Sequence, residues 1–265
     1  MLIIGEKINA TRKAVAAAIE QRDAKHIAEL ATTQAAAGAD YIDINGGDPR
    51  EGAEVRNMQW LMGLVQDSTD KPVTIDSANP EAICAGLKLA RRKPIINSIS
   101  LETERFNRVL PIVADNECMV IALLMADEGT PTGVEDRLRR AEQLVEKLTA
   151  VGKKPEEIIV DPCFFPVSAD AANAKAVCQA ILAIRQRIPG VYIGGGVSNS
   201  SYGLPARKLI NFAMMTAAIF HGMNAAIIDP LLPGMVPTIL ASEALSGADE
   251  WCMNYITAHR EGKLV

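Results

Sequence analysis

Six apolar segments of this chain end in side chains that need hydrogen-bond partners. In VTIDSAN, residues 73–79, a strand-like run of Val and Ile finishes on Asp76, Ser77 and Asn79. Local structure can explain one such ending, because Asp, Ser and Asn cap helices and shape turns. Six of them indicate a shared ligand. The other five endings are Asn45, Asn97, Asp161, the pair Ser198 and Asn199, and Asp229.

Each ending also has a local alternative. Asp76, Ser77 and Asn79 can cap a helix that starts near Pro80. Asn97 is harder to explain locally, because it interrupts an apolar strand where an unpaired amide would be costly. The remaining local alternatives are a loop start at Asn45 before Gly46 and Gly47, a turn at Asp161-Pro162, and a turn or cap at Asp229-Pro230.

The chemistry of these side chains is hydrogen bonding to a flat ring. A carboxylate accepts two hydrogen bonds, and a carboxamide supplies both a donor and an acceptor. Together they suit a planar heterocycle with adjacent N–H donors and a carbonyl, and the edge of a pterin fits that description. The three histidines, His26, His221 and His259, fall on expected helices or their ends. A histidine-activated nucleophile is therefore disfavoured, and we expect no metal bound by this chain.

The tract GGGVSNSSYGLPAR, residues 194–207, is the most distinctive in the sequence. Three consecutive glycines at a strand end would let a ligand ring lie close to the backbone. A phosphate cradle is the alternative. The tract lacks the Lys-Ser/Thr of a P-loop and the GxGxxG spacing of a dinucleotide site.

Eight short runs rich in Ile and Val predict β-strands, and amphipathic helices fill the intervals. Val55, Met58, Met62 and Val65, for example, share one helical face. Apolar strands alternating with amphipathic helices indicate a parallel sheet covered by helices, and eight units predict a (β/α)8 TIM barrel. A doubly wound open sheet is the alternative. The expected strands lie at about 2–6, 41–45, 72–76, 94–98, 118–124, 157–161, 191–196 and 224–228.

No linker divides the chain, so we expect one α/β domain over residues 1–265. In a barrel the carboxyl ends of all strands gather on one face, where the βα loops form the active site. The six polar endings should therefore converge on one mouth.

Composition restricts the partners. A formal charge of −5, with no basic run longer than residues 91–93, argues against a nucleic-acid or anionic-membrane surface.

Five cysteines without zinc-type spacing predict reduced thiols and a cytoplasmic location. The opening MLII is too short for a signal peptide. The apolar tract 212–228 is interrupted by His221, Gly222 and Asn224, which predicts a helix, a turn and a strand.

These segments resemble the pterin-binding methyltransferases, which include methyltetrahydrofolate:corrinoid protein methyltransferases and the folate module of cobalamin-dependent methionine synthase. The similarity runs from LIIGEKIN through YIDINGG, TIDSAN, IINSIS and IIVDPC to GGVSNSSYGLPAR, and the last segment is the most specific. The family fold is a TIM barrel. The resemblance implies transfer of a methyl group between N5 of tetrahydrofolate and the cobalt of a corrinoid (cobalamin) on a separate protein.

The resemblance also assigns roles to individual residues. Asp76, Asn97 and Asp161 match positions that hydrogen-bond the pterin ring. Asn199 matches the amide that reaches N5, so Asn199, Asp76 and Asp161 are the expected catalytic residues. The other expected substrate-binding residues are Gly196 and Ser198 beside the ring, Asn45 at a strand end, Arg207 near the folate tail, and Met125 at the pocket border, for which core packing is the alternative.

Other functions remain as alternatives. Dihydropteroate synthase shares this barrel, but that family places a Lys after strand seven and an Arg-x-His pair at strand eight, where this chain has SNSS and IIDP. IIDP also departs from methionine synthase and leaves the role of Asp229 open. A non-catalytic folate-binding subunit is a second alternative, and a barrel aldolase would need Lys7 as its Schiff base. The family resemblance implies a homodimer, but the corrinoid partner, transfer direction, proton donor and dimer interface stay open.

Overall fold

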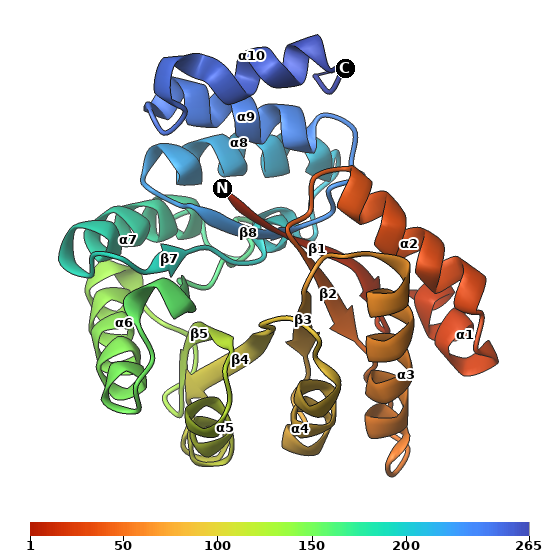
Figure 1. The fold of residues 1–265 in the computed structure, drawn as a ribbon. Helices are drawn as coiled ribbons and strands as arrows, with labels where there is room; N and C mark the ends of the chain where they lie inside the picture. The colour runs from red at the N-terminus through yellow and green to blue at the C-terminus, as the bar shows by residue number, and fades with distance from the viewer. Residues whose placement is uncertain (265) are drawn as a thin grey trace.

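Eight parallel strands curve around a common axis, and helices cover their outer surface (Figure 1). This computed structural model describes residues 1–264 and confirms the predicted TIM barrel and its eight strands. The strands are β1 (Leu2–Asn9), β2 (Tyr41–Asn45), β3 (Val73–Asp76), β4 (Ile95–Leu101), β5 (Met119–Ala126), β6 (Ile158–Asp161), β7 (Tyr192–Ile193) and β8 (Ala225–Ile228).

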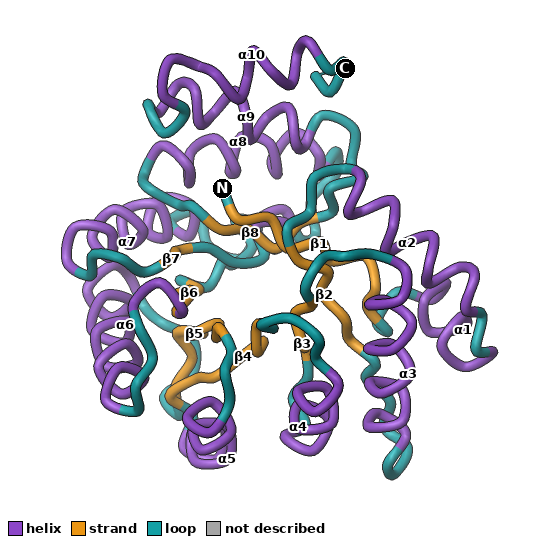
Figure 2. The backbone as a smooth tube through the Cα atoms, in the orientation of Figure 1, coloured by secondary structure: helices purple, strands orange, loops and turns teal. Residues whose placement is uncertain are grey.

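Helices alternate with these strands along the chain, and Figure 2 shows them outside the ring of strands. The α-helices are α1 (Lys13–Gln21), α2 (Ala24–Ala36), α3 (Ala53–Ser68), α4 (Pro80–Leu89), α5 (Thr103–Asp115), α6 (Gly133–Ala150), α7 (Asn173–Arg187), α8 (Arg207–Phe220), α9 (Met235–Ser246) and α10 (Met253–Arg260). Short 3-10 helices are η1 (Pro155–Glu157), η2 (Val197–Ser201) and η3 (Glu250–Cys252). Among residues 1–264, no helix has the length and apolarity to cross a membrane.

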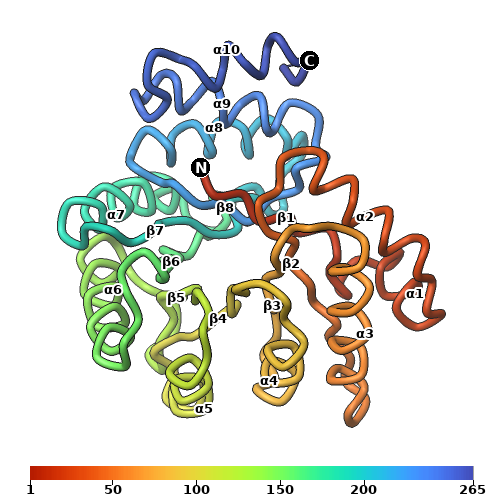
Figure 3. The backbone as a smooth tube through the Cα atoms, in the orientation of Figure 1, coloured from red at the N-terminus to blue at the C-terminus, as the bar shows by residue number. Residues whose placement is uncertain are grey.

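The chain runs around the ring in sequence order, as the steady colour change in Figure 3 shows. β1 pairs with both β2 and β8, so the first and last strands are neighbours. The remaining seam lies between β7 and β8. There Gly196 bridges to Ile227, and the N–H of Ile227 donates to the carbonyl of Gly195 at 3.1 Å.

The seam explains the largest difference from the sequence prediction. The predicted strand 191–196 is regular only at Tyr192–Ile193, because the glycine tract leaves the β6 ladder and closes the barrel onto β8 instead. A Cβ on Gly194 would lie 1.7 Å from the carbonyl oxygen of Ala225. The backbones therefore approach more closely there than any side chain permits.

Side-chain alternation divides the interior into two cores. One core lies between strands and helices and contains Ile42 and Ile44 of β2 and the predicted α3 residues Met58, Met62 and Val65. The other fills the inside of the barrel. Its buried members are Ile4, Ile95, Met119, Ile121, Ile159 and Ala225. Because successive side chains point to opposite faces, the next inward positions toward the carboxyl ends of β2 and β6 are Asp43 and Asp161.

We predict that Gly194→Ala lowers the free energy of unfolding by about 3 kcal/mol, because the added methyl would force β7 and β8 apart. Gly196→Ala is the matched control, since its Cβ would meet only the movable amide of Asn199 at 3.2 Å. Urea denaturation measures both. Equal stability of the two variants would contradict this account of the seam.

Candidate active site

Three of the expected residues lie side by side on adjacent strands. The Nδ2 group of Asn45, at the end of β2, donates to Oδ2 of Asp76 at 3.0 Å. Asp76 at the end of β3 is paired in register with Asn97 of β4. Asn79 has the helix-capping role that was its local alternative, because its side chain accepts the N–H of Glu81 at the start of α4. The carboxylate and the two amides therefore form one group at the mouth.

Asp161 contributes from β6, farther around the barrel. Its side chain accepts the backbone N–H of Cys163 at 2.9 Å, the turn that the local alternative proposed. The residue is only 8% exposed. Burial raises the pKa of Asp161 to about 6, and the bond from Cys163 lowers it in part. This carboxyl can therefore change protonation near neutral pH.

The glycine tract packs directly against this carboxylate. A Cβ on Gly195 would lie 2.3 Å from Oδ1 of Asp161, and a Cβ on Gly196 would lie 3.2 Å from Nδ2 of Asn199. The sequence interpretation explained the glycines by a ligand ring close to the backbone. In the structure, the neighbouring strand already requires a glycine at 194, and the Asp161 carboxylate requires one at 195.

Asn199 lies in η2 with its residue surface exposed at the mouth. Ser198 beside it is half-buried, and its carbonyl accepts a hydrogen bond from the guanidinium of Arg207 at 2.7 Å. Arg207 also donates to the hydroxyl of Ser201 at 2.9 Å. A cavity of about 280 Å³ is lined by Ser198 and Arg207, and also by Glu6 and Asp229.

Met125 and Asp229 have clear structural contacts. Met125 is partly buried against the hydrophobic core, which agrees with its packing alternative. Oδ2 of Asp229 accepts from the ammonium of Lys7 at 2.9 Å, and its Oδ1 accepts the N–H of Leu231 at 3.0 Å. An ammonium engaged in this ion pair is poorly suited to form the Schiff base of an aldolase.

Two acidic residues inside the barrel, Asp43 and Glu6, are not among the site residues predicted from the sequence. Asp43 is fully buried and registers with Thr74 of β3, and among the described residues neither Oδ1 of Asp43 nor Oγ1 of Thr74 has a hydrogen-bond partner. Burial raises the pKa of Asp43 well above its usual range; the Asp76 charge adds to this and a hydrogen bond from Asn97 opposes it. Burial also raises the pKa of Glu6, against the nearby charge of Arg12.

A sequence signal for Asp43 existed. It precedes Asn45 by two residues in YIDIN, so both side chains face the same way along β2. The acidic groups therefore continue below the strand ends, into the barrel. Within residues 1–264, no cluster of three His, Cys, Asp or Glu side chains has the arrangement to hold a metal ion.

The fold and site define an α/β barrel enzyme whose carboxyl-end mouth carries carboxylate and carboxamide side chains. The chain belongs to the pterin binding enzyme family, whose family model matches residues 5–229.

Two curated relatives match most of this chain. The chain is 36% identical to a methylcorrinoid:tetrahydrofolate methyltransferase of Eubacterium limosum, over 100% of this chain and 98% of that protein. It is 27% identical to a methionine synthase of Mycobacterium leprae, over 86% of this chain but only 20% of that larger protein.

Solved structures support the fold. A dihydropteroate synthase of Yersinia pestis superposes with a TM-score of 0.70 at 17% identity, covering 93% of each chain. One from Xanthomonas albilineans gives a TM-score of 0.68 at 19% identity, covering 92% of each chain. At such identities the likeness concerns the barrel alone.

We predict that Asp161→Asn stabilises the protein at neutral pH by about 3 kcal/mol. Because burial raises the pKa of Asp161 from 3.8 to about 6, the folded state favours the protonated carboxyl. The stability that the protonated Asp161 carboxyl contributes to the folded state is complete below pH 3.8, and it is lost as the pH rises through about 6.

Urea denaturation at about pH 4, 5 and 7 measures the effect, and the advantage of Asp161→Asn should vanish at the lowest pH. Asp170→Asn is the matched control, since Asp170 makes the same kind of turn bond, to Ala172, on an exposed loop. A stability difference for Asp161→Asn that does not change with pH would contradict the assigned cause.

Proposed function

We propose that this protein is a methyltransferase that moves a methyl group between N5 of tetrahydrofolate and the cobalt of a corrinoid. The corrinoid is a substrate carried by a separate protein. The observation that carries the proposal is the full-length similarity to the methylcorrinoid:tetrahydrofolate methyltransferase of Eubacterium limosum. The arrangement of acceptors around the mouth supports it independently, because it suits the donor-rich edge of a pterin.

In this proposal the ring lies across the mouth between two acidic groups. Asp76 and Asn97, with Asn45 behind Asp76, bind the ring edge from β3 and β4, and Asp161 binds it from β6. A ligand N–H would give the buried carboxylate of Asp161 a second hydrogen-bond donor and favour its charged form. Gly196 and Ser198 flank the ring, and Arg207 lies toward the folate tail.

The proton at N5 is the chemical difficulty. When N5 attacks a methylated corrinoid, the electron pair of the cobalt–carbon bond returns to cobalt, and N5 must release a proton. In the reverse direction N5 must gain a proton as its methyl group leaves, because an unprotonated nitrogen anion is a poor leaving group. A general acid or base contributes about 10²–10⁴-fold to such steps.

Asn199 suits both protonation states of N5, since its amide can donate or accept a hydrogen bond. Its exposed position on η2 leaves the side chain available to a ligand. Asp161, with a pKa of about 6, can exchange a proton near neutral pH through water. We assign Asn199 to N5, and assign Asp76 and Asp161 to ring orientation and proton exchange.

We also propose a homodimer in the cytoplasm. The five cysteines are free thiols among the described residues, which suits a reducing compartment. An apolar groove of about 500 Å³ between α7 and α8 is lined by Cys178, Met214 and Ala217, and the same helices expose Leu182 and Leu209. An apolar surface of this kind supports contact with a second copy.

We predict that Asn199→Ala slows methyl transfer by about 100-fold, the effect typical of losing one hydrogen bond to a developing charge. Growth of methylcobalamin from methyltetrahydrofolate and Co(I) cobalamin, followed spectroscopically without oxygen, measures the rate. Asp229→Ala should change the rate only a few-fold, because Asp229 is already bound to Lys7 and Leu231. An equal loss of methyl-transfer rate in the two variants would contradict the assignment of Asn199 to N5. Folate binding without transfer by the wild type would favour a binding subunit.

We predict that Asp161→Ala weakens methyltetrahydrofolate binding by about 10- to 100-fold, since it deletes a charged acceptor. The wild-type affinity should fall as the pH drops through about 6, where the carboxylate takes up a proton. Calorimetric titrations across this pH range test both effects, with Asp170→Ala as the exposed control. A wild-type affinity independent of pH would contradict the role of Asp161.

A further inference from the structure

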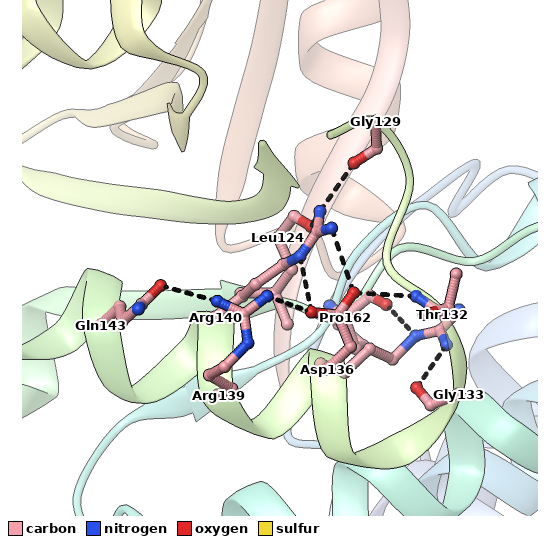
Figure 4. Close-up of polar contacts among 10 residues, drawn as sticks. Leu124, Gly129, Thr132, Gly133, Asp136, Arg139, Arg140, Gln143 and Pro162 are labelled. Atoms are coloured by element: carbon pink, nitrogen blue, oxygen red, sulfur yellow. Dashed lines mark hydrogen bonds and ion pairs between the residues drawn. The ribbon is translucent and has the colours of Figure 1, made fainter. Parts of the chain in front are cut away.

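Arginines on the helices outside the barrel hold backbone carbonyls beside the site residues. The guanidinium of Arg137 in α6 donates through Nε to the carbonyl of Pro162 at 2.7 Å and through Nη1 to that of Gly133 at 2.8 Å. Figure 4 labels both partners, Pro162 and Gly133, beside the neighbouring α6 residues. It also reaches the carbonyl of Cys163 at 3.4 Å. Arg137 is 1% exposed. Its charge is thus buried behind the two residues that follow Asp161.

These bonds bear directly on the Asp161 carboxylate. Cys163 has a φ of 62°, a left-handed conformation that costs a side-chain-bearing residue roughly 1–2 kcal/mol. In that conformation its N–H points at Oδ1 of Asp161. The carbonyl of Pro162 belongs to the same peptide group as this N–H, and Arg137 binds that carbonyl.

Arg105 in α5 repeats the arrangement on the other side of the mouth. It donates to the carbonyl of Ser77 at 2.8 Å and to that of Ser98 at 2.9 Å. These two residues directly follow Asp76 and Asn97 in the sequence. Two helices therefore hold the backbone next to Asp76, Asn97 and Asp161.

We propose that Arg137 and Arg105 are positioning residues for the ring-binding side chains, with Arg137 aiming the Cys163 N–H at Asp161 and Arg105 fixing Asp76 and Asn97. The ligand in this inference rests on the proposed function, whereas the positioning does not. A guanidinium suits the task because its several N–H groups diverge in one rigid plane and can bind carbonyls of two neighbouring peptides.

Arg185 in α7 provides a matched control. Its guanidinium donates to the carbonyl of Gly222 at 3.1 Å and to that of Val191 at 3.0 Å. Those carbonyls precede β8 and β7, at the amino end of the barrel. Arg185 thus makes the same type of hydrogen bond at the opposite end of the barrel from the mouth. We expect it to affect the stability of the fold and not ligand binding.

The test is an NMR titration of the Asp161 carboxyl carbon in the wild type, Arg137→Lys and Arg185→Lys, with Asp161→Asn to assign the signal. Lysine keeps the positive charge, but its three N–H donors lie on one nitrogen at the end of a flexible chain. It therefore cannot reproduce the rigid planar arrangement in which the guanidinium binds these carbonyls. Cys163 is the titrating residue next to this carboxyl, Arg137 and Arg140 are the charged groups that act on Cys163, and the packed glycine tract adds no titrating group.

We expect Arg137→Lys to raise the pKa of Asp161 by about 1, as its N–H partner is lost, and to weaken methyltetrahydrofolate binding at neutral pH about 10-fold. Arg185→Lys should lower the melting temperature and leave both quantities at their wild-type values. An unchanged Asp161 titration in a folded Arg137→Lys protein would overturn the proposal for Arg137.

If Arg137→Lys does not fold, Arg105→Lys, at a half-buried side chain, tests positioning by Arg105 through the Asp76 signal. The charged groups near Asp76 are Asp43, Glu54 and Arg105 itself, and lysine keeps the positive charge of Arg105. A raised Asp76 pKa with weakened binding supports positioning, and an unchanged Asp76 titration overturns it. The wild type could fail to bind methyltetrahydrofolate while the variants still show the expected change in carboxyl titration. That result would contradict the proposed ligand and support the positioning role.

Discussion

The carboxyl group of Asp161 is enclosed by the backbone of Gly195 on one side and by the loop of Cys163 on the other, with one N–H group as its partner. A carboxylate in this position is short of hydrogen bonds, and burial therefore favours its protonated form. The same constraint acts on Asp43, deeper in the barrel, where burial also raises the pKa of the carboxyl. The mouth is thus an acidic surface that a ring with several N–H donors would stabilise.

Several parts of the fold maintain that unfavourable arrangement. The apolar plug of Ile95, Ile121 and Ile159 fills the barrel below the acidic residues, so these residues are kept near the open end. The glycine tract brings β7 against β6 and β8 closely enough to cover Asp161. On the outside, arginine side chains of α5 and α6 bind the carbonyls of Ser77 after β3, Ser98 within β4 and Pro162 after β6. Stability contributed elsewhere in the chain offsets the strain stored at the mouth.

The relation to the dihydropteroate synthases illustrates how little of function resides in the barrel. Those structures superpose over more than 90% of the chain at under 20% identity. At the ends of β7 and β8 this chain carries Asn199, exposed on η2, and Asp229, paired with Lys7. A site made of strand ends and loops can change its chemistry while the ladders beneath it stay the same.

The sequence by itself determined the barrel and much of its mouth. Apolar runs and helical periods are local properties, and the gathering of parallel strand ends on one face follows from the topology, so Asn45, Asp76 and Asn97 could be placed together in advance. Only the tertiary structure decided how each group is surrounded. The burial of Asp43, the contact of Gly195 with Asp161, the short β7 and the arginine contacts from α5 and α6 all join residues from different βα units. Their spacing and orientation depend on how strands and helices pack, and no local pattern in the chain records that packing.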